Sequence, residues 1–442
     1  MPVGAQPEIR RVSAEQLRRW SWPIAFSTVL AVSSIFPLAP LIDLSNPDAL
    51  PAGTLHFPIA YHLLAPASVT LDTLTLLAPS QYLGTLGLGA IACIVCVALR
   101  SSSRGGRVSR RLLTLVFRLV FGALGLAELA LVARRPMASL TLPDPELLAV
   151  DFHSHTSASH DGRPSFGAEE NREWHSSAGF AAAYVTDHRT LEGAASGANG
   201  NPGLAGRGTT LLPGVELRDG DEHPILIGID PMRTRITSDD WQPALIGRDN
   251  DPTPAVLLLS LPGDLLRVPP EMIGGRVRVA GIELSDGSPR GIAQAGRDRE
   301  MIRTFATRSR VATVSGSDNH GWGRTAPAWS VMRIPGWKTM TPTELDVAIR
   351  RTLIAEGSRA VQVVARRSAP IPETTAGVVI SGFAVGVVLL RTMSVADRIS
   401  CCLWCWTLCA LLRLPSQLKH RSVVRIRTPA RENADVGAAA SV

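Results

Sequence analysis

Histidines and acidic residues gather in a short stretch around residue 155, directly after an apolar run that is typical of a β-strand. His153 and His155 are two residues apart, and His160 and Asp161 follow them closely. Alternate side chains of a strand point to the same face, so two imidazoles at this spacing can bind one divalent cation. His160 and Asp161 could reach a second cation nearby. The stretch therefore predicts a metal centre, although an H-x-H pair alone also arises by accident at protein surfaces.

Three further clusters downstream favour the metal interpretation. Each follows a short apolar run, and together they supply His188, Glu216 with His223, and Asp318 with His320. In a barrel of parallel strands, the side chains at the carboxyl ends of different strands converge on one mouth. Residues that are far apart in the sequence can therefore build a single site, as in a metal-dependent hydrolase.

The order of these motifs is H-x-H-T, S-H-D-G, T-D-H, G-V-E and G-S-D-N-H. In that order the chain resembles the PHP family, the polymerase and histidinol phosphatase phosphoesterases, over roughly residues 148 to 335. The resemblance implies an α/β fold, namely a distorted seven-stranded β/α barrel of the TIM-like kind. It also implies two or three divalent metal ions at the barrel mouth, drawn from manganese, iron and zinc.

The resemblance also implies which residues bind each ion. The first set is His153, His155, Glu216 and Asp318; the second is His188, His320 and either His160 or Asp161; His223 would bind a third, bridged ion. The register with Gly162 favours Asp161 over His160. Asp318, Glu216 and His188 are the predicted catalytic residues.

Two positions depart from the family pattern. Leu261 stands where the family typically has a metal-binding histidine, so the third ion is expected to be weakly bound or absent. His175 matches no family ligand, and we expect it on the exposed side of a helix over residues 167 to 178.

The expected chemistry is hydrolysis of a phosphate mono- or diester, because two nearby divalent ions polarise a phosphoryl oxygen and activate water. Arg189 follows the T-D-H motif and Arg324 lies four residues after His320, so both are candidates for binding the phosphate. In a chain this rich in arginine, an Arg on a loop is more often simply solvated.

The composition predicts a membrane protein. The 442 residues have a mean hydropathy of +0.14, and the apolar excess is localised. Stretches near the length of a transmembrane helix are Trp22–Ile42, Tyr82–Leu99 and Leu112–Val132, and two shorter ones are Thr375–Leu390 and Ile399–Leu412. The predicted organisation is a basic segment 1–21, three transmembrane helices in 22–135, a catalytic domain 145–368, two hydrophobic helices in 369–414, and a basic, disordered tail 415–442.

Basic residues predict the orientation of these spans. Arginines precede the first span and separate the second from the third, whereas residues 43 to 80 contain no Lys or Arg. Basic flanks favour the cytoplasm, so a multi-pass protein of the cell membrane is expected, with its catalytic domain outside the cytoplasm. The basic carboxyl tail fits this orientation only if one of the last two hydrophobic segments crosses.

Two functions from different classes remain open on the sequence. The first is a membrane-anchored, metal-dependent phosphoesterase acting on a phosphorylated small molecule or envelope component. The second is a catalytically impaired barrel that serves as a membrane ligand-binding or signalling module, an alternative that the Leu261 position keeps open. The net charge of +7 is concentrated beside the apolar stretches and in the tail, so membrane lipid rather than nucleic acid is the expected partner. The Gly- and Ala-rich stretch from Gly193 to Gly208 is expected to be a loop.

Overall fold

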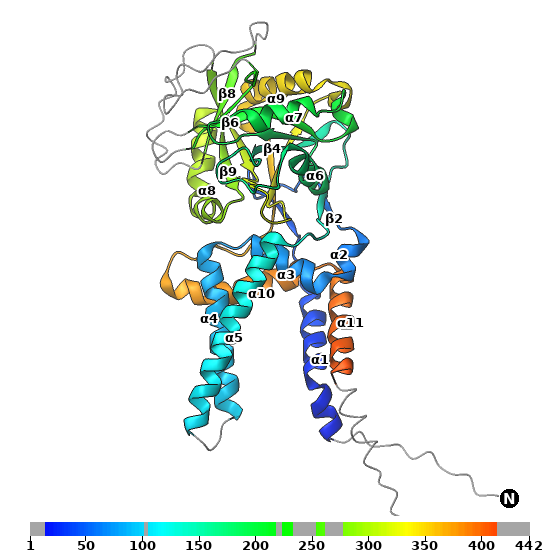
Figure 1. Cartoon of the computed structure of the whole chain (residues 1–442), viewed down its shortest axis with the longest axis vertical. Coiled ribbons are helices and arrows are strands. Elements are labelled where there is room, and N and C mark those ends of the chain that lie inside the picture. The colour runs from blue at the N-terminus through cyan, green and yellow to red at the C-terminus, as the bar shows by residue number, and fades with distance from the viewer. Residues whose placement is uncertain (1–13, 101–104, 218–222, 233–252, 261–276, 413–442) are drawn as a thin grey trace, which may run out of the picture.

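The computed structural model describes residues 14–100, 105–217, 223–232, 253–260 and 277–412. An α/β domain lies at one end of the molecule, and long helices project from its other end (Figure 1). The strands are β1 (Leu41–Asp43), β2 (Thr54–His56), β3 (Ser139–Thr141), β4 (Leu147–Ser154), β5 (Ala182–Val185), β6 (Thr210–Glu216), β7 (Ile225–Ile227), β8 (Ala255–Leu259), β9 (Val277–Asp286), β10 (Ala312–Gly316), β11 (Ala328–Arg333) and β12 (Gln362–Arg366).

The helices fall into the two parts of the molecule. Those of the α/β domain are α6 (Ala168–Ala178), α7 (Glu192–Asn199), α8 (Pro289–Ser309) and α9 (Pro342–Glu356), with short 3-10 turns η1 (Ala205–Arg207), η3 (Trp337–Thr339) and η4 (Gly357–Arg359). Those of the helical part are α1 (Ala14–Ser33), α2 (Ile59–Leu63), α3 (Ala65–Thr75), α4 (Pro79–Arg100), α5 (Gly105–Val132), α10 (Thr375–Thr392) and α11 (Val395–Leu411).

Ten strands form one curled sheet in the order β1-β12-β11-β4-β5-β6-β7-β8-β9-β10, and β2 pairs separately with β3. Strands β4, β5 and β6 are parallel, as are β8, β9 and β10, whereas β7 is antiparallel to both of its neighbours. The α/β prediction is confirmed, but the prediction of seven strands is wrong. Antiparallel strands β11, β12 and β1 continue the sheet beyond β4, where they satisfy backbone groups that an edge would leave unpaired.

The curl of the sheet brings the carboxyl end of β10 back to the carboxyl end of β4. The backbone N–H of His155 donates to the carbonyl of Asn319 at 3.0 Å, and that of Asp318 donates to the carbonyl of His153 at 2.9 Å. These two bonds place the H-x-H motif beside the D-N-H motif, although 163 residues separate His155 from Asp318 (318 − 155).

Local sequence signals start the helices that cover the sheet. The hydroxyl of Ser288 accepts a hydrogen bond from the N–H of Gly291, and Pro289 opens α8. Thr341 and Glu344 form a capping box at the start of α9. The prediction of a loop from Gly193 to Gly208 is wrong over α7, where packing against β6 selects a helix. A Cβ on Gly197 would lie 3.0 Å from Leu211 of β6, so glycine at this position lets α7 approach the strand closely.

A buried ion pair joins α9 to the strands. Arg350 is fully buried, and its Nη2 lies 3.0 Å from Oδ2 of Asp346 one turn earlier. Its Nη1 also donates to the carbonyls of Thr253 and Pro254, each at 2.8 Å, at the start of β8. The hydroxyl of Tyr184 donates to the other carboxylate oxygen of Asp346 at 2.9 Å. Every charged group in this pair therefore has partners.

The helical part carries apolar surface on its outside. Two helical segments of the described chain are long and apolar enough to cross a membrane, Thr114–Val132 and Thr375–Thr392, and only 6% and 17% of those residues are buried. Pro79–Val95 is a shorter apolar helix. The helix expected over Trp22–Ile42 ends at Ser33, and its last residues enter β1 of the sheet.

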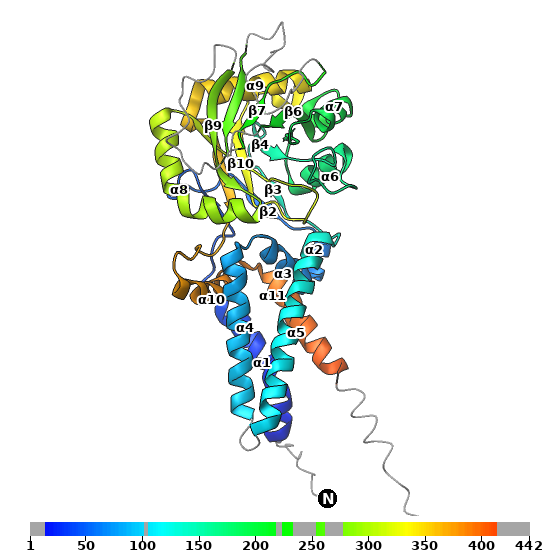
Figure 2. The ribbon, with the colours of Figure 1, turned by 60° about the vertical axis from the view of Figure 1, so that its left-hand side comes forward.

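The two long apolar segments, which lie in α5 and α10, have different directions relative to the α/β domain. Helices α1, α4, α5 and α11 point away from the α/β domain, whereas α10 lies across them, next to that domain (Figures 1 and 2). Two glycines allow α10 to approach α4 closely: a Cβ on Gly84 would lie 2.0 Å from the carbonyl of Val378, and one on Gly382 would lie 2.4 Å from the carbonyl of Gly84.

Candidate metal centre

The first predicted ligand set converges at the carboxyl ends of β4, β6 and β10. Oε2 of Glu216 lies 3.0 Å from Nε2 of His153 and 3.1 Å from Nε2 of His155. Oδ1 of Asp318 lies 3.2 Å from the same nitrogen of His155. The strands thus deliver all four predicted side chains to one point.

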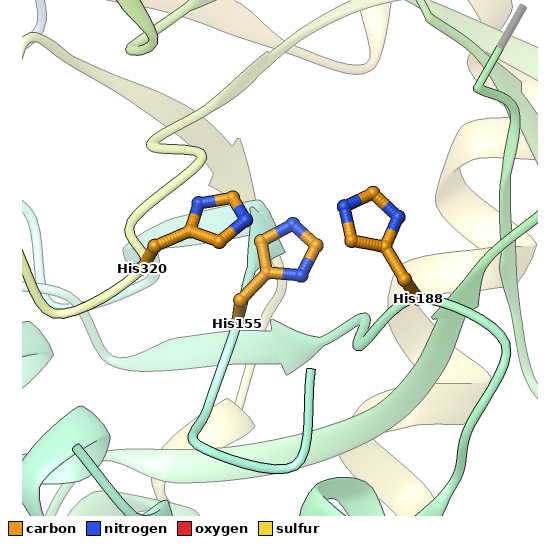
Figure 3. A group of neighbouring side chains, drawn as sticks. All are labelled: His155, His188 and His320. Carbon is orange, nitrogen blue, oxygen red and sulfur yellow. The ribbon is translucent and has the colours of Figure 1, made fainter. Parts of the chain in front are cut away.

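The second predicted set lies against the first. Oδ2 of Asp161 is 3.2 Å from Nε2 of both His188 and His320. Oε2 of Glu216 is 3.2 Å from Nδ1 of His188, so this carboxylate touches both sets. Figure 3 shows the His155 ring between those of His188 and His320, and the ring centroids are 4.8 Å and 3.9 Å away.

The remaining predicted ligands lie at the edge of this cluster. The side chain of His160 is 76% exposed, and its Nδ1 is 3.8 Å from the Asp161 carboxylate. Asp161 contacts both imidazoles of the second set, which favours it over His160 as the ligand. Nδ1 of His223 lies 2.7 Å from Oε1 of Glu216, beside His188. Leu261 lies outside the described residues.

The spacing of these atoms fits divalent ions. Two ligand atoms that are each about 2.1 Å from one ion lie roughly 3.0–3.5 Å apart, which matches the contacts of Glu216, Asp318 and Asp161 with the imidazoles. Both ring nitrogens of His155 and Nε2 of His320 are buried. Although Nε2 of each ring lies close to a carboxylate, none of these three atoms forms a hydrogen bond with a described residue. Buried polar atoms of this kind need a partner, and a metal ion would supply it.

Electrostatics also favour a cation at this position. Burial alone would lower the pKa of His153, but Glu283, Glu216 and Asp318 raise it well above its usual value. Burial would raise the pKa of Glu216, yet His153, His155 and His223 hold it well below its usual range, so Glu216 is ionised. Burial lowers the pKa of His188 to about 4, which keeps that imidazole neutral and its lone pair available.

Buried hydrogen bonds fix the ligand-bearing turns. Oδ1 of Asp151 accepts from the N–H of Ser317 at 2.9 Å, and its Oδ2 lies 2.7 Å from Nε2 of His175. His175 is fully buried, so the expected exposed position is wrong: the helix turns its histidine toward β4, where Asp151 binds it. The carboxylate of Asp187 accepts from the N–H and hydroxyl of Thr156 at 2.6 and 2.7 Å, which fixes the turn after His155.

One acidic residue of the site was not predicted from the sequence. Glu283 of β9 is fully buried, and its Oε1 lies 3.0 Å from Nδ1 of His153, on the far side of the ring from Glu216. Such a contact selects the tautomer and ring orientation of a metal-binding imidazole. A lone Glu inside the apolar run of β9 was the signal available in the sequence.

We expect Glu283→Gln to lower metal affinity by roughly 10–100-fold, the range typical of removing an outer partner of a ligating histidine. Competitive titration of the full-length protein with a chelator would measure this change. Glu300→Gln, at an exposed position of α8, is the matched control and should bind metal as the unaltered protein does. Unchanged affinity in Glu283→Gln would mean that His153 needs no orienting carboxylate.

The two predicted phosphate-binding arginines lie in different surroundings. Arg189 has a left-handed φ of 54°, and its backbone N–H donates to the carbonyl of Glu216 at 3.2 Å, which places this residue beside the cluster. Arg324 is half-buried, and burial lowers its pKa, with Arg134 and Arg135 acting in the same direction. Its role in binding phosphate stays a prediction.

No family model and no curated protein matches the sequence. Solved structures that are similar to part of the chain include three proteins. PsfC from Pseudomonas syringae has 14% identity and a TM-score of 0.33, over 56% of this chain and 99% of that one. A two-domain protein from Bacteroides vulgatus, described as containing a predicted PHP-like metal-dependent phosphoesterase, has 15% identity and a TM-score of 0.32, over 50% and 68%. An amidohydrolase from Chromobacterium violaceum, solved with sulfate and no metal, has 17% identity and a TM-score of 0.26, over 49% and 97%.

Likeness at these identities and scores assigns neither a family nor an activity. The side chains of the cluster are therefore the basis of the proposed function.

Proposed function

We propose that this protein is a metal-dependent phosphoesterase held at a membrane by its apolar helices. The observation that carries the proposal is the shared position of Glu216 between two ligand groups, one with His153, His155 and Asp318 and the other with His188, His320 and Asp161. A carboxylate placed in this way can bridge two ions. Divalent ions bound there would polarise a phosphoryl oxygen and lower the pKa of a bound water.

The protonation states of the second ligand group suit metal binding. Neutral His188 and His320 offer lone pairs, because burial lowers the pKa of each. Burial would raise the pKa of Asp161, but it is lowered to about 2, chiefly by the hydrogen bond that Ser159 donates, so a carboxylate faces the second group near neutral pH. The second group therefore presents neutral nitrogens and an ionised oxygen, the forms in which these groups bind metals, whereas His153 and His155, whose pKa values the neighbouring carboxylates raise, would each release a proton on binding an ion.

Metal content and hydrolysis of the full-length protein in detergent test the proposal. We expect about two tightly bound divalent ions per chain, because the described part of the chain brings together two groups of three or more ligand side chains. We also expect hydrolysis of p-nitrophenyl phosphate, of bis(p-nitrophenyl) phosphate, or of both, and the pair separates monoesterase from diesterase activity. Bound metal without hydrolysis would favour the ligand-binding alternative, and absence of metal after supplemented expression would overturn the phosphoesterase proposal.

The proposed membrane arrangement rests on the directions of the helices. Helices α1, α4, α5 and α11 project from the same side of the molecule, and α10 lies across them (Figures 1 and 2). If these four cross the membrane and α10, although long and apolar enough to cross, lies at its surface, the chain crosses four times before the carboxyl tail. The order of the helices along the chain then puts the arginine-rich flanks and the basic tail on one side of the membrane and the α/β domain on the other. The basic side would be the cytoplasmic one, because basic flanks favour the cytoplasm.

Reporter fusions test this arrangement. A reporter enzyme that is active only outside the cytoplasm should be active when fused after Arg135, and silent when fused after Ser103 or after Val442. The fusion after Val442 is the discriminating one, because it should be active if α10 and α11 both cross. A silent fusion after Arg135 would place the metal centre in the cytoplasm.

A further inference from the structure

A pocket of about 330 Å³ joins the metal centre to the ends of the apolar helices. The predicted ligands Asp161, Asp318 and His320 line one part of it. Leu76, directly after α3, and Leu131, in the last turn of α5, line another part. Residues of the helical part thus form a wall of the opening to the metal centre.

Hydrogen bonds fix this opening against the helices. The loop that follows His320 is bonded to both α5 and α3. The N–H of Gly323 donates to the carbonyl of Leu131 in α5 at 2.8 Å, and the hydroxyl of Thr75 in α3 donates to the hydroxyl of Thr325 at 2.9 Å. A ligand-bearing loop that is bonded directly to α3 and α5 cannot move away from them without losing these bonds. The position of the metal centre relative to the helices is therefore built into the fold.

A buried charge cluster strengthens the same junction. Asp72 of α3 is 3% exposed, and its carboxylate lies 3.1 Å from guanidinium nitrogens of Arg135 and of Arg366. The hydroxyls of Thr325 and Tyr61 donate to it at 2.9 and 3.0 Å. The Asp72 carboxylate thus connects α3 to the chain after α5, to the loop after His320 and to strand β12. Because it has so many partners, a hinge motion at this point would be unfavourable.

Exposed apolar side chains lie on the face of α5 that ends at the pocket. Val120, Leu124 and Leu131 recur at the spacing of one helix face and are exposed, and the exposed Glu128 lies on the same face between Leu124 and Leu131. The exposed ring of Trp322 also lines the pocket, and the guanidinium of Arg163 lies 5.3 Å from its centre. An exposed Trp beside a cation is typical of the depth at which lipid headgroups lie.

We infer that the substrate of the metal centre is a lipid phosphate: a phosphate ester whose apolar chain stays in the membrane while its phosphate enters the pocket. This inference rests on the proposed phosphoesterase function. The carboxylates and imidazoles of one wall suit metal-assisted binding of the phosphate, and the leucines of the other wall suit the first methylene groups of the chain. A water-soluble phosphate ester would leave that apolar wall in contact with water.

The reaction balances with water as the only co-reactant. The water oxygen forms a bond to phosphorus, the ester bond between phosphorus and the lipid oxygen breaks, and that oxygen takes a proton. From a lipid phosphomonoester the products are a lipid alcohol, which remains in the membrane, and inorganic phosphate, which leaves into water.

The experiment compares two esters with the same headgroup. Full-length protein in phosphatidylcholine vesicles is given either phosphatidic acid in those vesicles or glycerol 3-phosphate in solution, and released phosphate is measured. Phosphatidylglycerol and glycerophosphoglycerol form the corresponding pair for a diesterase. We expect kcat/KM to be about tenfold or more higher for the lipid member of the pair, because contacts with the remote chain contribute binding energy to the reaction.

Two leucines of α5 with equal exposure provide the matched variants. Leu131 lines the pocket and is 43% exposed, whereas Leu126 is 44% exposed and does not line it. Leu131→Gln should reduce the preference for the lipid ester severalfold, and Leu126→Gln should retain both activities.

The possible outcomes separate the inference from the proposed function. Hydrolysis of the soluble ester with no preference for the lipid would overturn the inference alone. A lipid preference that survives Leu131→Gln would overturn the route through this pocket. Failure to hydrolyse any of the four esters or either p-nitrophenyl ester would overturn the inference together with the phosphoesterase function on which it rests.

Discussion

Replacing Asp318 by asparagine is expected to abolish phosphate-ester hydrolysis and to reduce bound metal, while the protein still folds. Asp318 lies at a left-handed φ of 45°, a conformation that Asn tolerates and that most other residues do not. Asn also has the same size, so the change removes the charge and one metal-binding oxygen with little else. The loss in kcat/KM should exceed the roughly 10–100-fold that removal of an outer partner costs, because Asp318 would bind the ion directly.

Elemental analysis and hydrolysis of p-nitrophenyl esters measure the two effects in the same preparation. Asp48→Asn, at an exposed position outside the cluster, is the matched control and should behave as the unaltered protein does. His153→Ala tests the opposite side of the first ligand group and should give the same loss. Unaltered turnover in Asp318→Asn would show that this cluster is not the active site.

Replacing Arg350 by methionine is expected to lower the free energy of unfolding by about 3–5 kcal/mol, the typical effect of removing one member of a buried ion pair. Met keeps most of the aliphatic volume of Arg350 but leaves the carboxylate of Asp346 buried with the Tyr184 hydroxyl and no cation from residue 350. It also removes the donors to the carbonyls of Thr253 and Pro254.

Denaturant or thermal unfolding of the purified protein would measure this loss. Arg351→Met is the matched control, because the next residue on α9 is exposed and contacts Thr253 through a single hydrogen bond at 2.9 Å. Its effect should stay within about 1 kcal/mol. The double change Asp346→Leu with Arg350→Met should recover part of the lost stability, since no buried charge then remains at either position. Equal stability of Arg350→Met and Arg351→Met would contradict this account.

The sequence predicts which side chains gather in the cluster, because the motifs that carry them are local. His153, His155 and Asp318 stand in short motifs at the ends of apolar runs, and the structure brings them together through strand ends that converge. Glu283 escaped prediction because nothing around it in the sequence distinguishes a ligand-orienting acid from an isolated charge in a strand. Its partner His153 is 130 residues away, and only the curl of the sheet joins them.

The parts of the fold that could not be predicted depend on long-range contacts. The three residues of β1 pair with β12, with Leu41 opposite Arg366, and no local periodicity indicates a partner more than 300 residues away. Helix α7 forms in a Gly-rich segment because it packs against β6, where tertiary contacts outweigh the low helix propensity of glycine. His175 is buried for a similar reason, since Asp151 provides a partner that the amphipathic pattern of α6 does not reveal.

The pairing of β1 with β12 has a practical consequence for anyone who wishes to study the α/β domain apart from the helical part. A fragment that starts near residue 145 would include β12 but would lack β1, and it would also lose Leu44 from the hydrophobic core. The backbone groups of β12 that now bond to β1 would become an open sheet edge, which is a template for pairing between molecules. Such a fragment is expected to self-associate, whereas one in which residues 38–56 are joined by a short linker to residue 137 would keep both β1 and the β2–β3 pair. The segment between the first two long helices is thus as much a piece of the α/β domain as the strands that carry the histidine and carboxylate cluster.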